Sequence, residues 1–434
     1  MTRLAFFSPV PPAATGIADY AADVLRLLPP RYAVDVFHDV AAPDHARLPS
    51  SCRVYPHADF AARQAERPYD LAMYQLGNGP AHDFIYAPLA RVPGLLVLHD
   101  LVLHHSRARM FLDSPEARAY ARAPGSGEAR RGAGAVLAHY ADEVRYSYPA
   151  AGDRLVMAQL GTVGDLLPYA YPLFRLPVES SRLVAVHNAF MAAAVREEVP
   201  GAEVVRVPMP MEAATVGAAA VAALRARHGI AAGDFVVGTF GLVTREKRVE
   251  TVARAVARAA AVHPAVRLLV VGPVADGAAL EERLRALGVM SRAMVTGRVP
   301  FADLPAYIEL ADAVVHLRYP TARETSAALL RVLAQGRPTV MADLENMAEV
   351  PAGAAIRADV SDEEGEVTRA ILRLAASSSL RARLGRAARE FVAREHAPAR
   401  AAEAYAAAIE RARSRPDPPP RPWPSHWPAP DRSA

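Results

Sequence analysis

Polar residues that could do chemistry follow short apolar runs at four places in the chain. The first is Gly16, in PPAATGIADY, which stands just before a segment with helical spacing. A glycine lets a ligand approach the backbone closely, and the start of a helix attracts anions. An ordinary strand-to-helix turn would carry the same glycine, so this position predicts an anion-facing loop without excluding a structural one.

The second place combines QLGNGPAH, which holds Asn78 and His82, with LLVLHD, which holds His99 and Asp100. An imidazole has an ordinary pKa of about 6.5, so His99 could take a proton from a hydroxyl near neutral pH, with Asp100 orienting it. Histidines that only satisfy buried backbone groups are the alternative. No His-Glu helix motif accompanies them, and we expect no metal site.

The third place is FGLVTREKR, where Lys247 is the only lysine among the 50 lysine and arginine residues of the chain. The preceding apolar run ends at Gly241, and Arg245 lies between Gly241 and Lys247. A lysine offers a compact charge to phosphate oxygens, and an arginine adds a forked donor. The stretch predicts a phosphate-binding loop, against the alternative of a solvated basic turn.

The fourth place is RYPTARETSAALL, where Glu324, Thr325 and Ser326 open a segment with helical spacing. Unpaired N–H groups at a helix start can bind an anion, and Glu324 can accept hydrogen bonds from sugar hydroxyls. Threonine and serine are also common helix caps, and capping can coexist with ligand contact. A cationic strand end together with such a helix start favours a diphosphate ligand.

All four places lie where predicted strands end. Apolar segments such as LAFFSPV, LAMYQL and GLLVL alternate with helix-like segments, and the alternation restarts after Pro210 with DFVVGTF and VRLLVV. This pattern indicates parallel sheets covered by helices on both faces, and such sheets bind ligands beyond the carboxyl ends of their strands. We therefore expect an α/β chain with two Rossmann-like, doubly wound domains that face each other across a cleft.

Four parts are expected along the chain. They are a first domain over residues 1–205, a second over 206–390, a C-terminal helix within 391–413, and a Pro-rich tail over 414–434. The Ala- and Arg-rich region from about 106 to 175 is predicted to be helical. The tail is expected to be disordered or to serve as an extended ligand for a protein partner.

The composition narrows the class of protein. With 434 residues, 52% of them hydrophobic, the chain can build two full cores and is not disordered as a whole. No apolar run approaches the roughly 18 residues of a membrane span, and the lone Cys52 excludes a disulfide framework. The mild net charge of +4 does not indicate nucleic acid. We expect a cytoplasmic protein, with peripheral contact at the inner membrane face left open.

These stretches together resemble the GT-B glycosyltransferases, in particular the retaining family 4, also called glycosyl transferases group 1. PVPPAATGIADYAADVL is similar to that family's glycine loop and first helix, and FGLVTREKRVE to its glycine-x5-lysine donor signature. VVGPV and VTGRVPFADLPAYIELADAVVHLRYPTARETSAALLRVLAQGRP are similar to its nucleotide half. The resemblance implies a hexosyltransferase-type enzyme that moves a sugar from a nucleotide-diphosphate donor to an acceptor hydroxyl, with retention of anomeric configuration.

The resemblance also implies residue roles. Lys247 would neutralise the leaving diphosphate, Glu324 would hold donor-sugar hydroxyls, and His99 would face the acceptor and the donor sugar. No metal or other cofactor is needed if Lys247 and Arg245 supply enough positive charge. The donor side would comprise Gly16, Gly241, Arg245, Lys247, Glu324, Thr325 and Ser326, with Arg298 and Val299 beside the nucleobase; the acceptor-side candidates are Asn78, His82 and Asp100.

Two departures from the family pattern leave other readings open. Leu242 stands where the family has an arginine, which Arg245 could replace, and the slot of the second family glutamate falls on Val332 or Arg331. A nucleotide-sugar epimerase, a sugar phosphorylase or synthase of the same fold, and a catalytically degenerate scaffold remain alternatives. The donor sugar and nucleotide stay undetermined, as does the choice among glycan, lipid-linked and small-molecule acceptors.

Overall fold

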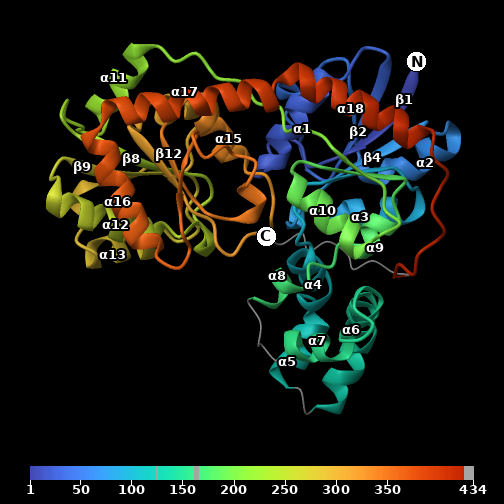
Figure 1. Cartoon of the computed structure of the whole chain (residues 1–434). Coiled ribbons are helices and arrows are strands. Elements are labelled where there is room, and N and C mark those ends of the chain that lie inside the picture. The colour runs from blue at the N-terminus through green and yellow to red at the C-terminus, as the bar shows by residue number, and fades with distance from the viewer. Residues whose placement is uncertain (124–125, 161–165, 425–434) are drawn as a thin grey trace. The chain divides into compact units, whose positions relative to one another are not determined.

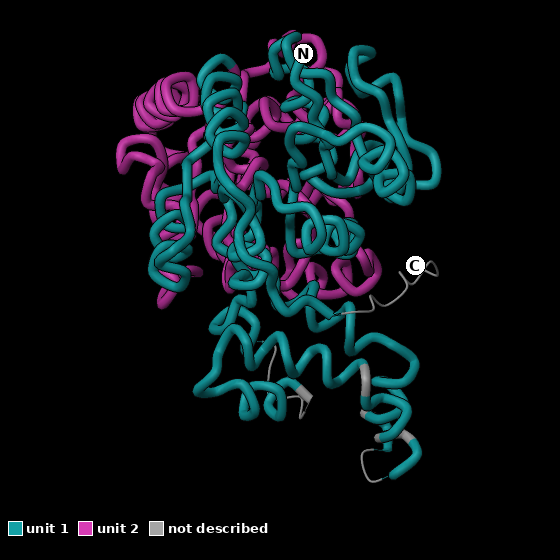
Figure 2. The backbone as a smooth tube through the Cα atoms, turned by 90° about the vertical axis from the view of Figure 1, so that its right-hand side faces the viewer, with its two compact units in different colours: residues 1–210, 322–325, 399–434 teal, residues 211–321, 326–398 magenta. Residues whose placement is uncertain are grey.

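The computed structural model describes residues 1–123, 126–160 and 166–424, and its backbone divides into two compact units (Figure 2). Unit 1 comprises residues 1–210, 322–325 and 399–434, and unit 2 comprises residues 211–321 and 326–398. The division after residue 210 lies close to the predicted boundary after residue 205. The fold class is the one expected, because each unit is built on a parallel sheet flanked by helices.

The sheet of unit 1 has seven strands. In chain order they are β1 (Thr2–Phe7), β2 (Tyr32–His38), β3 (Arg53–Pro56), β4 (Leu71–Leu76), β5 (Leu95–Leu98), β6 (Leu183–Val186) and β7 (Val204–Arg206). Their spatial order is β3-β2-β1-β4-β5-β6-β7, and every neighbouring pair is parallel. The order reverses between β1 and β4, which is where doubly wound sheets bind ligands.

Helices cover this sheet and extend beyond it. Those that alternate with the strands are α1 (Gly16–Leu27), α2 (Phe60–Glu66), α3 (Asp83–Arg91) and α10 (Ala189–Glu198). Helix α18 (Pro398–Arg413), from the far end of the chain, also belongs to unit 1, and its Tyr405 hydroxyl is hydrogen-bonded to that of Tyr20 on α1.

The region between β5 and β6 forms a helical group of its own (Figure 1). It contains α4 (His104–Leu112), α5 (Pro115–Arg122), α6 (Gly127–Ser147), α7 (Gly152–Leu160) and α8 (Leu167–Ala170). The last helix of the region, α9 (Arg175–Glu179), packs instead on the main core of unit 1, beside α3 and α10. A small core around Phe111, Tyr140 and Leu155 holds the group together. The prediction of helix for residues from about 106 to 175 is therefore confirmed for the part described.

The sheet of unit 2 has six parallel strands. They are β8 (Phe235–Phe240), β9 (Val266–Val271), β10 (Ala293–Val295), β11 (Ala313–His316), β12 (Thr339–Ala342) and β13 (Ile356–Ala358), in the spatial order β10-β9-β8-β11-β12-β13. The helices are α11 (Ala218–Arg227), α12 (Val249–Val262), α13 (Gly277–Ala286), α14 (Leu304–Leu310), α15 (Ala327–Ala334), α16 (Glu363–Ala376) and α17 (Ser378–Glu395).

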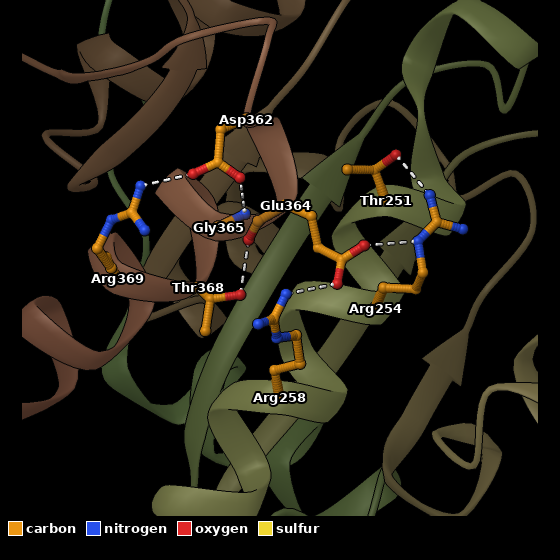
Figure 3. Close-up of polar contacts among 8 residues, drawn as sticks. All are labelled: Thr251, Arg254, Arg258, Asp362, Glu364, Gly365, Thr368 and Arg369. Carbon is orange, nitrogen blue, oxygen red and sulfur yellow. Dashed lines mark hydrogen bonds and ion pairs between the residues drawn. The ribbon is translucent and has the colours of Figure 1, made fainter.

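Helices α12 and α16 are joined at their surface by a polar cluster (Figure 3). Glu364 accepts from Arg254 Nε at 2.9 Å and from Arg258 Nη1 at 3.0 Å, while Asp362 caps α16 by accepting from the Gly365 N–H. Such exposed ion pairs contribute up to about 1 kcal/mol each, so the apolar core beneath them supplies most of the stability. The cluster fixes the start of α16.

The first part of the C-terminal tail is placed against unit 1, contrary to the expectation of disorder. Trp423 donates from Nε1 to Ser180 Oγ at 2.7 Å and packs on the core of unit 1, and Arg182 Nε lies 2.6 Å from Asp417 Oδ1. These anchors dock the segment from Asp417 to Trp423 on unit 1, although it contains no helix or strand. The rest of the predicted tail, 425–434, lies outside the described residues.

Within the described part of the chain, no helix combines the length and the apolar character that crossing a membrane would require.

Candidate functional site

The acceptor-side candidates come together in unit 1, as their places at the carboxyl ends of neighbouring strands predict. The Asn78 N–H donates to Asp100 Oδ2 at 2.7 Å. A Cβ on Gly77 would lie 3.0 Å from His82 Nε2 and 2.5 Å from Ile17 Cδ1, so only glycine lets these groups approach. The exposed start of α1, where Gly16 lies, therefore converges with the ends of β4 and β5.

His99 is buried in this cluster and both of its ring nitrogens have partners. Nδ1 lies 3.0 Å from Nε2 of His187, and Nε2 lies 2.9 Å from Oε1 of the Gln75 side chain. His187 Nδ1 lies 2.8 Å from the carbonyl oxygen of Val207, which can only accept a hydrogen bond, so this nitrogen carries a proton. With both rings neutral, His187 Nε2 accepts from His99 Nδ1, and His99 Nε2 then needs a donor. A half-turn of the Gln75 amide supplies it, because this exchanges Oε1 for Nε2, which has no hydrogen-bond partner among the described residues in its present position.

Burial keeps His99, His82 and His104 neutral near pH 7. It lowers the pKa of His99 well below the ordinary value, and the neighbouring His187 and His82 lower it further. Burial likewise lowers the pKa of His82 to about 4 and that of His104 to about 4. In this arrangement neither nitrogen of His99 is open to an acceptor hydroxyl, which suits positioning better than proton transfer.

Asn188 ties the segment 322–325 into the same unit. Its side-chain nitrogen lies 3.0 Å from Thr325 Oγ1 and 3.2 Å from the Arg323 carbonyl oxygen, while its oxygen caps α10. The Leu101 N–H donates to the Ala322 carbonyl at 2.9 Å. Two predicted donor residues, Thr325 and the buried Glu324, are therefore grouped with the acceptor-side candidates of unit 1.

In unit 2, Lys247 folds over the end of β8. Its Cε and Nζ atoms would both lie 3.6 Å from a Cβ on Gly241, and the lysine is only 8% exposed. Gly241 has φ 112°, a conformation that other residues rarely adopt. The structure thus brings together the glycine and lysine that the sequence paired, and places the ammonium group at the carboxyl edge of the sheet.

Two further glycines border the same edge. Gly272 follows β9 and Gly297 follows β10, with φ 148° and 66°. A Cβ on Gly272 would lie 2.0 Å from the Gly241 carbonyl oxygen, so the chain ends of neighbouring strands touch here. Backbone exposed in this way can approach a phosphate or a nucleobase closely.

His316 ends β11, the neighbour of β8, and was not among the residues predicted from the sequence. Burial lowers its pKa well below the ordinary value, and the charges of Lys247 and Arg318 lower it further. Its Nε2 atom is buried without a hydrogen-bond partner among the described residues. The sequence signal for His316 is that it is the polar residue that ends the apolar run AVVH.

The loop that carries Lys247 is anchored by Arg248 and Glu363. Arg248 adopts a left-handed conformation, with φ 52°, and its Nε lies 2.5 Å from Oε2 of Glu363, which is 3% exposed at the start of α16. Burial raises the pKa of Glu363, and Arg248 opposes that shift. This contact, which the sequence did not reveal, holds the turn next to Lys247.

The remaining predicted donor residues all belong to unit 2. Ser326 caps α15 by accepting from the Leu329 N–H at 3.3 Å, so the helix begins two residues later than Thr325. Arg245 and Arg298 are exposed, as is Leu242, while Val299 is partly buried against the core.

The structure shows where the two residues lie that could occupy the position of the second family glutamate. Val332 is buried in the core of unit 2, and the Arg331 guanidinium lies 4.6 Å from the ring centre of Phe301. Neither side chain can supply the carboxylate that the family pattern has there. Among the described residues, no group of three or more His, Cys, Asp or Glu side chains is placed to hold a metal ion.

Comparison with known proteins agrees with this geometry. Residues 234–377 match the family model described as "Glycosyl transferases group 1". Comparison with curated protein sequences gives no match to this chain.

Several solved structures share the fold along nearly the whole chain. HepE of Anabaena, in complex with UDP and glucose, is 17% identical with a TM-score of 0.63, covering 94% of this chain and 100% of its own. Sucrose-phosphate synthase from Thermosynechococcus elongatus is 17% identical with a TM-score of 0.66, covering 95% and 99%. WaaG, a glycosyltransferase involved in lipopolysaccharide biosynthesis, is 14% identical with a TM-score of 0.62, covering 92% and 98%. Residues 234–377 therefore match a glycosyl transferases group 1 domain, and the whole chain shares the GT-B fold of these structures.

Proposed function

We propose that the protein transfers a sugar from a nucleotide-diphosphate donor to an acceptor hydroxyl with retention of configuration, as in family 4. The observation that carries this proposal is the buried ammonium of Lys247, folded over Gly241 at the glycine-bordered edge of unit 2. A cation held in a dry site, beside backbone that a ligand can approach closely, suits a diphosphate.

Departure of the nucleoside diphosphate is the demanding step. The bond between the anomeric carbon and the phosphate oxygen breaks, and negative charge builds on the leaving group. Lys247 stabilises that charge, an effect typically worth several kcal/mol. Arg245 and the N–H groups at the start of α15 add to it, and Glu324 holds hydroxyls of the donor sugar.

The acceptor attacks on the face that the diphosphate leaves, so configuration is retained without a protein nucleophile. The acceptor oxygen bonds to the anomeric carbon, and its proton passes to the departing phosphate oxygen. His99 then acts as a positioning residue, in keeping with its two occupied ring nitrogens. Asn78, His82 and Asp100 supply the acceptor-side surface, and Arg298 with Val299 borders the nucleobase.

No metal ion takes part in the proposed reaction, and the protein works in the cytoplasm, where an anionic membrane surface remains a candidate site of action. HepE holds UDP and glucose in the structure compared above, which supports UDP-glucose as the first donor to test. Turnover in the presence of EDTA should equal turnover in its absence.

The test is an assay of nucleotide release with UDP-, GDP- and dTDP-sugars, each with and without a panel of acceptor hydroxyls. We expect release that depends on the acceptor, and a product whose anomeric proton coupling matches that of the donor. Conversion of the donor without any acceptor would indicate an epimerase instead. No nucleotide release with any donor would contradict a transferase and favour a scaffold.

A further inference from the structure

A cavity of about 310 Å³ lies in unit 2, away from the residues assigned to the donor. It is lined by Asp312, Gly336, Arg337, Pro338, Arg381, Ala382, Gly385, Arg386 and Arg389. Arg337 and Asp312 precede strands β12 and β11, so the cavity lies at the amino ends of these strands. Lys247 and Gly241 follow the carboxyl end of β8, at the opposite edge of the same parallel sheet.

Four guanidinium groups and one carboxylate line this cavity. The carboxylate, on Asp312, already accepts from the Val236 N–H at 2.8 Å. Arg337 is paired with Glu309 at 2.8 Å, but its buried Nε has no hydrogen-bond partner among the described residues. Positive charge therefore exceeds negative charge around the cavity, and at least one buried donor is left for an anion.

Part of this arginine cluster has a structural role. Arg389 Nη2 donates to the Gln335 carbonyl at the end of α15, at 2.9 Å, and Arg381 Nη1 donates to the Leu374 carbonyl at the end of α16. Arginine near a helix carboxyl end is stabilising. Each of these contacts uses one nitrogen, and a guanidinium has five N–H donors, so several remain.

Arg386 is different from its neighbours. It is exposed on α17 and makes no hydrogen bond or ion pair within the described part of the chain. Capping of helix ends therefore does not explain why Arg386 faces the same cavity as Arg381 and Arg389. A fourth like charge at this place costs free energy unless an anion offsets it.

Two glycines give the cavity its shape. A Cβ on Gly336 would lie 2.4 Å from Arg389 Nε, and a Cβ on Gly385 would lie 2.2 Å from the Gly336 carbonyl oxygen. Gly336 also has φ 67°. Only glycine at both positions lets α17 approach the turn before β12, and this approach brings the arginines of α17 beside Arg337.

We propose that this arginine pocket binds a small phosphate-bearing anion at a site separate from the sugar donor. The pocket volume lies at the lower end of the range for small-molecule sites, which fits a phosphorylated metabolite or pyrophosphate in solution. Planar guanidinium forks match the paired oxygens of a phosphate. The proposal does not depend on which sugar the enzyme transfers.

The test is calorimetric titration of the full chain with pyrophosphate, at low and at physiological salt. The two key variants are Arg386→Ala and Lys247→Ala, and Arg383→Ala is the matched control, an exposed arginine of α17 that does not line the cavity. Arg386→Ala should weaken the binding at least about fivefold, while Arg383→Ala leaves it unchanged. If the Lys247→Ala variant still binds pyrophosphate, and if adding Arg386→Ala to it weakens that binding, the arginine pocket is separate from the donor site.

Equal pyrophosphate affinity in the unaltered chain and in Arg386→Ala would overturn the proposal. So would a response confined to Lys247→Ala, because it would place all the binding at the donor edge. Vesicles containing phosphatidic acid provide the second arm. Binding of vesicles without binding of soluble pyrophosphate would also overturn it, because the occupant would then be a lipid headgroup. Because Arg386 makes no contact that folding needs, the Arg386→Ala variant should unfold at the same temperature as the unaltered chain, and thermal unfolding of each variant provides this control.

Discussion

The Nε2 atom of His187 lies 3.0 Å from Nδ1 of His99, and the hydrogen bond of His187 to the Val207 carbonyl sets the direction of this contact. Tyr20 packs edge-on against both rings. His187 therefore orders a ring that sequence analysis treated as a candidate base. The proton on His99 Nδ1 has one acceptor here, and that acceptor is a second histidine.

Replacing His187 should separate hydrogen bonding from packing. His187→Leu leaves the buried N–H of His99 without an acceptor and should cost about 1–3 kcal/mol of unfolding free energy. His187→Gln places an amide oxygen near the position of Nε2 and should recover much of that loss. Chemical denaturation measures both, and kcat measured beside KM should show a larger loss of turnover in the leucine variant. Equal behaviour of the two variants would contradict an ordering role for His187.

The buried histidines make the protein sensitive to acid. The pKa of His82 falls from its ordinary 6.5 to about 4 on folding, so the unfolded chain binds more protons between these values. Stability should be constant above pH 6.5 and fall as the pH drops toward 4, by up to about 3 kcal/mol for His82 alone. His104, His99 and His316 shift in the same direction.

Thermal unfolding between pH 4 and 8 measures this dependence. The variant His82→Asn removes one titrating group, so its stability should fall less steeply over the same range. A slope identical to that of the unaltered chain would mean that His82 does not stay neutral in the fold.

Neighbouring glutamates on α16 offer a matched comparison. Glu363 is buried against Arg248, beside Lys247, whereas Glu364 pairs at the surface with Arg254 and Arg258. Glu363→Gln should cost about 2 kcal/mol and raise KM for the donor, because the turn next to Lys247 loses its anchor. Glu364→Gln should cost less than about 1 kcal/mol and leave KM unchanged. Equal effects on KM would contradict an anchoring role for Glu363.

Trp423 should stabilise unit 1 although it belongs to a proline-rich segment. Trp423→Ala removes the hydrogen bond to Ser180 and apolar contacts with the core, and should cost about 2 kcal/mol. Arg421→Ala removes a partly exposed ion pair and a 3.4 Å hydrogen bond, both with Glu179, and should cost less than about 1 kcal/mol. Differential scanning calorimetry of both variants measures these losses. If the segment were not docked, Trp423→Ala would leave the unfolding temperature unchanged.

Much of this architecture could be predicted from the sequence because buried parallel strands are continuous apolar runs. Gly241 and Lys247 were identified because they close such a run and open the next segment, and Asn78 with Asp100 for the same reason. Residues whose role depends on distant partners gave no local signal. The contact of His187 with His99 spans 88 positions, and that of Arg248 with Glu363 spans 115 positions.

The tail was predicted wrongly in its first part for a related reason. Its composition indicates an extended chain, and the sequence does not show that Ser180 and the core of unit 1 receive Trp423. Likewise, the arginines of α17 appear in sequence as an ordinary charged helix face. Only Gly336 and Gly385, whose close approach is visible in three dimensions, bring that face against Arg337.

The central claim is that Lys247 recognises the diphosphate of the donor. The most direct measurement is calorimetric binding of UDP and of uridine to the unaltered protein and to Lys247→Ala, with GDP and dTDP and their nucleosides tested alongside. We predict that Lys247→Ala weakens binding of the preferred nucleoside diphosphate at least tenfold and leaves binding of its nucleoside unchanged. Equal diphosphate affinity in the two proteins would contradict the account.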